Sequence, residues 1–120
     1  EVLMSSKKKR LLPEDTYEAL LLHTEKMDSS NNRPMLRMRW LIDNPEYLGN
    51  VVHSYIMLDS PKAMKLLDMI KEFLGFNRKD IDLDNLHKMH LSKCRIHVVK
   101  TKHDGKQFNT IKKFYPIEKE

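Results

Sequence analysis

Residues 35–43 alternate between apolar and polar side chains more regularly than any other part of the chain. Side chains on an extended backbone point to opposite faces in turn, so this pattern predicts a β-strand with one face in a core and the other in solvent. The apolar face consists of Leu36, Met38, Trp40 and Ile42, and the polar face carries Arg37, Arg39 and Asp43. Turn-forming residues at 28–34 precede this strand and imply a hairpin with an earlier one.

Four other segments have strand character. They occupy residues 16–26, 51–58, 94–102 and 107–115. In the first, Tyr17, Ala19, Leu21 and His23 are expected on one face, whereas Leu20, Leu22 and Thr24 are expected on the other. The last two strands are separated by Asp104-Gly105, a pair typical of tight hairpins.

One amphipathic helix is predicted between the third and fourth strands. Asp59 or Ser60 can cap its start, and Pro61 suits the first turn because its missing N–H would have no acceptor there. Gly75 can provide a left-handed C-terminal cap. The apolar side chains recur at helical spacing: Ala63, Leu66, Leu67, Ile70, Phe73 and Leu74. Leu83, Leu86 and Met89 can form a short helical turn before the fourth strand.

This order of elements is compatible with a mainly β OB-fold, a five-stranded barrel with one helix between strands three and four. Other small α+β folds can have the same order. The chain of 120 residues suits one core. We therefore expect a single OB-fold domain over residues 11–120, preceded by a flexible basic arm over residues 1–10.

Positive charge is concentrated in the second half of the chain. Residues 1–60 carry eight basic and nine acidic side chains, a net charge of −1, whereas residues 61–120 carry fourteen and eight, a net charge of +6. Such an excess favours a polyanion as the partner, although a solvated, solubilising surface would have the same composition. No apolar run approaches the ~20 residues of a membrane span, so we expect no association with a membrane.

Motifs for catalysis are weak. The three glycines, at 49, 75 and 105, form neither a phosphate-binding loop nor a Gly-x-Ser-x-Gly turn. His87, His90 and Cys94 are residue types that zinc accepts, but no second half-site follows, and surface histidines with a buried thiol are the favoured interpretation. Residues 80–84 lack the glycine and glutamate of a calcium loop. We expect no enzymatic activity, no cofactor and no metal.

A protein that binds single-stranded DNA needs cations along a groove for the phosphates and aromatic rings on which the bases stack. Both occur on predicted strands and loops that form the usual ligand groove of an OB-fold. The candidate DNA-binding residues are Arg33, Arg37, Arg39, His53, Tyr55, Lys100, Lys102, Lys106, Phe108, Lys112 and Lys113. Packing in a core is the alternative for Tyr55, Phe108 and Tyr115, and it is the favoured interpretation for Trp40.

Four stretches of the chain together resemble a phage-encoded family, long catalogued as a domain of unknown function, whose members are often described as single-stranded-DNA-binding proteins. The stretches are residues 12–19 (LPEDTYEA), 34–36 (PML), 48–52 (LGNVV) and 104–112 (DGKQFNTIK). The resemblance covers residues 11–117 and implies an OB-fold protein used in phage DNA replication or recombination. The family tends to have glycine before its opening Tyr-Glu, where this chain has Asp15-Thr16. It supplies no motif for individual DNA contacts.

Two other functions stay open from the sequence. The chain could be an interaction module that docks onto a host replication or defence protein, with Met27, Met35 and Met57 as an adaptable contact surface. A metal-dependent nuclease is a weaker alternative. A homodimer through edge strands is also compatible with the pattern. The single cysteine and the absence of a signal-peptide pattern favour the cytoplasm, here a host bacterial cytosol.

Overall fold

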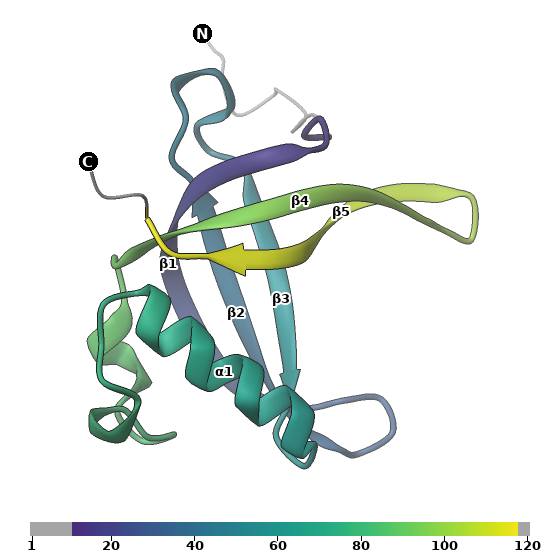
Figure 1. Ribbon diagram of the computed structural model, residues 1–120. Coiled ribbons are helices and arrows are strands. Elements are labelled where there is room, and N and C mark those ends of the chain that lie inside the picture. Colours follow the sequence, from purple (N-terminus) through teal and green to yellow (C-terminus); the bar gives the residue numbers. More distant parts are fainter. Residues whose placement is uncertain (1–10, 118–120) are drawn as a thin grey trace, which may run out of the picture.

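The computed structural model describes residues 11–117 and is mainly β, with one α-helix (Figure 1). The predicted basic arm over residues 1–10 lies outside the described residues. The regular elements are β1 (Asp15–Asp28), β2 (Pro34–Ile42), β3 (Val51–Met57), α1 (Pro61–Phe73), β4 (Lys93–His103) and β5 (Lys106–Tyr115). Short 3₁₀ turns lie at Pro45–Tyr47, Arg78–Asp80 and Leu86–Met89. The five predicted strands and the helix are thus found in the predicted order.

The strands form one antiparallel sheet in the order β3-β2-β1-β4-β5. β1 pairs with β4 through its first part and with β2 through its second, so it belongs to both halves of the sheet. Figure 1 shows β1 curving between these two halves. Over residues 11–117 no ladder joins the edge strands β3 and β5. The sheet is therefore not closed into the predicted barrel. Side chains of both edge strands instead line a cleft between β3 and β5.

The core lies on the inner face of the sheet. The four apolar side chains of the alternating strand β2 are all fully buried, as the alternation predicts: Leu36, Met38, Trp40 and Ile42. The indole Nε1–H of Trp40 donates a hydrogen bond of 3.0 Å to Ser54 Oγ on β3, which satisfies the polar atom of a buried ring. α1 adds Leu67 and Ile70 to the same core.

Both ends of α1 follow from local sequence. Ser60 Oγ accepts a hydrogen bond of 3.2 Å from the Ala63 N–H, and Pro61 occupies the first helical position. Gly75 has φ of +95°, and the N–H of Phe76 donates to the Lys71 carbonyl, which completes the left-handed cap. No helix over the described residues is long and apolar enough to cross a lipid bilayer.

A bulge in β1 corrects one expectation from the sequence. The register passes from Leu21 opposite Trp40 to His23 opposite Arg39, so Leu22 is an extra residue. The extra residue moves His23 to the outer face of the sheet, with Arg39, and away from the face that buries Tyr17, Ala19 and Leu21. Strict alternation through the strand had predicted the opposite.

Candidate nucleic-acid interface

The outer face of β1, β2 and β3 presents side chains in rows that cross the three strands. The rows follow from the ladder registers, because residues directly opposite one another point to the same face. We call them the arginine–tyrosine row (Glu25, Arg37, Tyr55), the histidine row (His23, Arg39, His53) and the methionine row (Met27, Met35, Met57). Two of the three rows therefore carry a guanidinium at their centre.

The predicted DNA-binding arginines differ in their ion pairs. Arg33, in the β1–β2 loop, donates two hydrogen bonds to Asp59, of 3.1 Å from Nε and 2.9 Å from Nη2. This pairing raises the pKa of Arg33 and lowers that of Asp59. Arg37 pairs through Nη2 with Glu25 in its own row. A carboxylate already neutralises each of these two cations.

Arg39 has no such partner. It is half-buried, and between Leu11 and Ile117 no carboxylate forms an ion pair with it. Its Nε is buried and lacks a hydrogen-bond acceptor, as does the Nε of Arg37. A buried donor without an acceptor is unfavourable. An anion bound on this face would supply the acceptors and the compensating charge.

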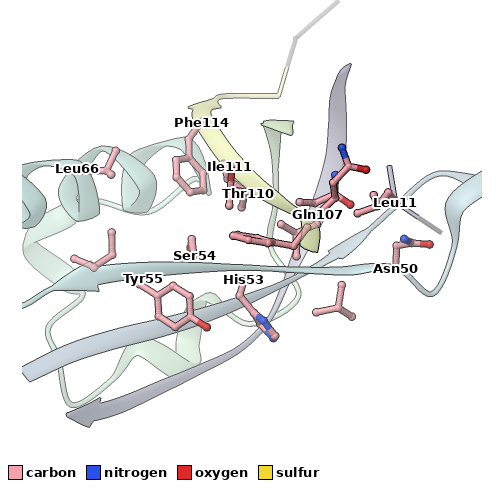
Figure 2. A pocket seen from close by; sticks show the side chains of 15 residues that line it. Leu11, Asn50, His53, Ser54, Tyr55, Leu66, Gln107, Thr110, Ile111 and Phe114 are labelled. Atoms are coloured by element: carbon pink, nitrogen blue, oxygen red, sulfur yellow. The ribbon is translucent and has the colours of Figure 1, made fainter. Parts of the chain in front are cut away.

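A cleft of about 580 Å³ lies between the edge strands β3 and β5, beside the arginine–tyrosine and histidine rows. Its depth is apolar, with Leu66 from α1 and Ile111 and Phe114 from β5. Figure 2 shows that His53 and Tyr55 leave β3 on the side away from Leu66 and Phe114, which places their rings on the outer face.

Two large aromatic rings border this cleft and remain exposed to solvent. Tyr55 on β3 has 52% of its surface exposed, and Phe108 on β5 has 42%. The His53 and Tyr55 rings lie with their centroids 6.4 Å apart. Tyr115, in contrast, does not line the cleft. Arg95 Cζ on β4 lies over the Tyr115 ring, 5.8 Å from the ring centroid.

The predicted lysines divide between two places. Beyond Val98, β4 no longer pairs with β1, and the ends of β4 and β5 form a two-stranded arm that projects from the body (Figure 1). Lys100 and Lys102 on β4 and Lys106 on β5 are exposed on this arm, and Phe108 lies on its β5 strand. Lys112 and Lys113 lie closer to the body, at the register shift opposite His97 and Val98.

The structure thus brings together only part of the predicted site. Arg37, Arg39, His53 and Tyr55 share one face, and Phe108 lies across the cleft from them. Arg33 is held by Asp59, and none of the five predicted lysines lines the cleft. His23 is not among the residues predicted from the sequence, because the bulge that turns it outward has no signal in the alternation.

The N-terminal approach to β1 is fixed to β5 by one side chain. The amide N–H of Leu12 donates to Asn109 Oδ1 at 2.8 Å, and Asn109 Nδ2 donates to the Leu12 carbonyl at 3.1 Å. Asn109 Nδ2 also donates to the Val99 carbonyl at 3.3 Å. Leu12 is fully buried, and both Leu11 and Asn109 line the cleft. This clamp holds the base of the arm to the body.

The histidines and the cysteine of the weak metal pattern have other surroundings. Cys94 is fully buried on β4, and burial raises the pKa of its thiol to about 12, so the thiol stays protonated at neutral pH. His90 Nε2 is hydrogen-bonded to Thr24 Oγ1 at 2.9 Å. Burial lowers the pKa of His90, and His23 and His87 lower it further. The part of the chain that the structure describes contains no group of three His, Cys, Asp or Glu residues arranged to hold a metal ion.

In comparisons with known proteins, the chain matches no protein-family model and no curated protein.

Proposed function

We propose that this protein binds single-stranded DNA with little sequence preference and without catalysis, on a partly open OB-fold. The strand order and the position of α1 between β3 and β4 support this fold. In an OB-fold the ligand lies on the face of strands two and three, between the loops that follow strands one and four. On such a fold, the arginine–tyrosine and histidine rows and the β4–β5 arm would be the elements that contact the ligand.

The observation that carries the proposal is the Arg39 guanidinium, which forms no ion pair within residues 11–117 and lies one row away from the exposed ring of Tyr55. A half-buried cation without a carboxylate suits a phosphate, which accepts several hydrogen bonds and carries the opposite charge. Tyr55 offers a flat apolar surface on the same face, and Phe108 offers another across the cleft. Bases stack on such rings only when they are not paired in a duplex, so the combination favours a single strand.

A role in phage DNA replication or recombination rests on the resemblance of residues 11–117 to the phage family described above. The phage or host replication and recombination proteins would then be further partners.

Removal of the Arg39 charge tests the proposal. We expect Arg39→Gln to weaken binding of fluorescently labelled oligo-dT and to reduce the slope of log K against log salt by about 0.7, the contribution of one phosphate contact on a single strand. Replacing Arg37 and Arg39 together by Ala should flatten the slope further. Fluorescence anisotropy titrations at several salt concentrations measure both quantities.

The matched control is Lys79→Gln, which removes one exposed charge in the 3₁₀ turn after α1, outside the three rows and the cleft. Its salt slope should equal that of the wild type. Unchanged anisotropy of the wild-type protein at low salt and micromolar concentration would exclude the proposal, and equal slopes for Arg39→Gln and Lys79→Gln would exclude this face.

A second candidate function is a protein-interaction module, and the methionine row favours it. Met27, Met35 and Met57 are direct neighbours on three adjacent strands and are half-buried on the outer face. Flexible, polarisable side chains in such a cluster suit an adaptable protein contact. If this is the function, the immobilised chain should retain a host replication or defence protein from a nuclease-treated extract. Met35→Lys should abolish that retention. The wild-type chain should then show no binding of oligo-dT.

A further inference from the structure

The histidine row places two titratable rings on either side of the unpaired arginine. Arg39 is opposite His23 of β1 on one side and opposite His53 of β3 on the other. Directly opposed side chains on neighbouring antiparallel strands have Cβ atoms about 4.5–5.5 Å apart. A phosphate that contacts the Arg39 guanidinium would therefore lie within reach of both imidazoles.

Arg39 is the permanently charged member of the histidine row. In the next row, Glu25 is engaged by Arg37. In the row on the other side, Leu20, Leu41 and Val51 are apolar. The protonation states of His23 and His53 thus decide whether the row carries one positive charge or as many as three.

Other titratable and charged groups lie beside His23, along the part of β1 that no longer pairs with β4. His90 is close, with ring centroids 5.7 Å apart, and His87 lines the same cavity of about 260 Å³. Lys26 and Asp84, which also line it, pair with each other at 3.6 Å. His53 has Tyr55 as its ring neighbour on β3. Asp84, the carboxylate among the residues that line this cavity, therefore already has a lysine partner.

We propose that the row His23–Arg39–His53 is a proton-linked phosphate site, in which His23 is a further nucleic-acid contact and binding takes up protons. This inference rests on the proposed function. Histidine is the side chain whose charge changes between about pH 5 and 8. A bound phosphate stabilises the protonated imidazole, and by linkage a protonated imidazole stabilises the bound phosphate. Affinity for single-stranded DNA therefore rises as the pH falls.

The expected size of the pH effect on affinity follows from the number of protons taken up. Each proton bound on association changes the affinity by at most tenfold per pH unit, so one linked proton predicts up to a 100-fold tighter complex at pH 6 than at pH 8. If Arg39 alone bound the phosphate, the affinity should not change between pH 6 and pH 8, because a guanidinium remains charged throughout.

The test uses anisotropy titrations of the wild-type chain with labelled oligo-dT at pH 6, 7 and 8 and constant ionic strength. Calorimetry at pH 7 in two buffers of different ionisation enthalpy counts the protons taken up. Circular dichroism at each pH monitors folding. This control is needed because the lowered pKa of His90 gives a stability contribution that is present above the unfolded pKa and is lost as the pH falls through the folded pKa.

The variants are His23→Gln and His53→Gln, which retain a hydrogen-bonding side chain and cannot be protonated. Each should reduce the pH dependence of the affinity, and the double variant should abolish it. The matched control is His97→Gln on β4, outside the row. His97 Nδ1 lies 3.0 Å from Thr16 Oγ1, and its Nε2 lies 3.4 Å from Glu14 Oε2. Its pH dependence should equal that of the wild type.

Three results would overturn the inference. Binding with an affinity independent of pH and no proton uptake would exclude the linked site while leaving the proposed function intact. Equal losses of pH dependence in His97→Gln and in the row variants would exclude the row as its origin. Absence of binding at every pH would exclude both the inference and the proposed function.

Discussion

Tyr55 is a large aromatic residue that the fold does not need for its core. More than half of its surface is exposed, and it stands opposite Arg37 on the outer face. Removal of this ring should change the free energy of unfolding little, whereas a base stacked on the ring would lose its contact surface. Effects on stability and on binding can therefore be separated at this residue.

We expect Tyr55→Ala to weaken oligo-dT binding by about 1–3 kcal/mol, roughly 5- to 150-fold, because one base loses its stacking surface. Tyr55→Phe keeps the ring and should bind as the wild type does. Anisotropy titrations give the affinities, and thermal unfolding should show the same midpoint for all three proteins. Wild-type affinity in Tyr55→Ala would mean that no base stacks at this position.

At the same scale, the sequence predicts side chains well where the strand is regular. Alternation places Trp40 in the core and Arg37 and Arg39 on the other face; Trp40 is fully buried, and the two arginines are half-buried on the outer face. It misplaces His23, because the bulge at Leu22 changes the phase of β1 and depends on its two partner strands. Whether a given arginine has a carboxylate opposite it, as Arg37 has Glu25, requires the register between strands, which no single segment contains.

At the scale of elements, the β4–β5 arm is the feature with the clearest functional consequence. Beyond Val98, no third strand of the described residues pairs with it, so its cations could approach a ligand bound on the body as proposed. The Asp104-Gly105 turn that reverses the chain has positive φ at both residues, +52° and +78°, as the sequence pair predicts for a tight hairpin.

Neutralising the arm should reduce electrostatic binding without affecting the fold. We expect the triple variant Lys100→Gln, Lys102→Gln, Lys106→Gln to lower the salt slope of oligo-dT binding by about 2, if each lysine contacts one phosphate. The double variant Lys112→Gln, Lys113→Gln is the comparison, since these residues lie at the body end of β5, and its slope should change less. A smaller effect of the triple variant than of the double variant would contradict this placement of the ligand.

Local signals also explain why α1 is predicted accurately. Ser60, Pro61 and Gly75 act within one helical turn of each end, so their effect does not depend on the rest of the fold. The projection of the arm, in contrast, is set by where β1 begins. That start depends on the pairing of Asp15 with Val98 between segments 83 residues apart in the sequence.

At the scale of the whole molecule, the order of strands and helix could be predicted from the sequence, but closure of the sheet could not. Closure requires β3 and β5 to meet along their edges, and the distance between them depends on the curvature of β1 and on the bulky side chains in the cleft, such as Phe114. The Asn109 clamp is equally non-local, since it joins residues 97 positions apart.

Loss of this clamp should destabilise the protein. Asn109→Ala leaves the Leu12 N–H and carbonyl without their partners in a largely buried setting, and we expect a loss of about 1–3 kcal/mol in the free energy of unfolding. Urea denaturation followed by circular dichroism measures it. Gln107→Ala, at an exposed position two residues away on the arm, should leave the midpoint unchanged. A wild-type midpoint in Asn109→Ala would show that water replaces the clamp without cost.

The position of the three rows decides how a long polymer could be loaded. A tunnel accepts a polymer only through a free end, whereas a surface on the outside of a sheet can receive an internal stretch from the side. The rows cross β1, β2 and β3 on the outer face of the sheet and not inside a barrel. If single-stranded DNA binds there as proposed, circular molecules and the interior of very long linear ones should be as accessible as short fragments are.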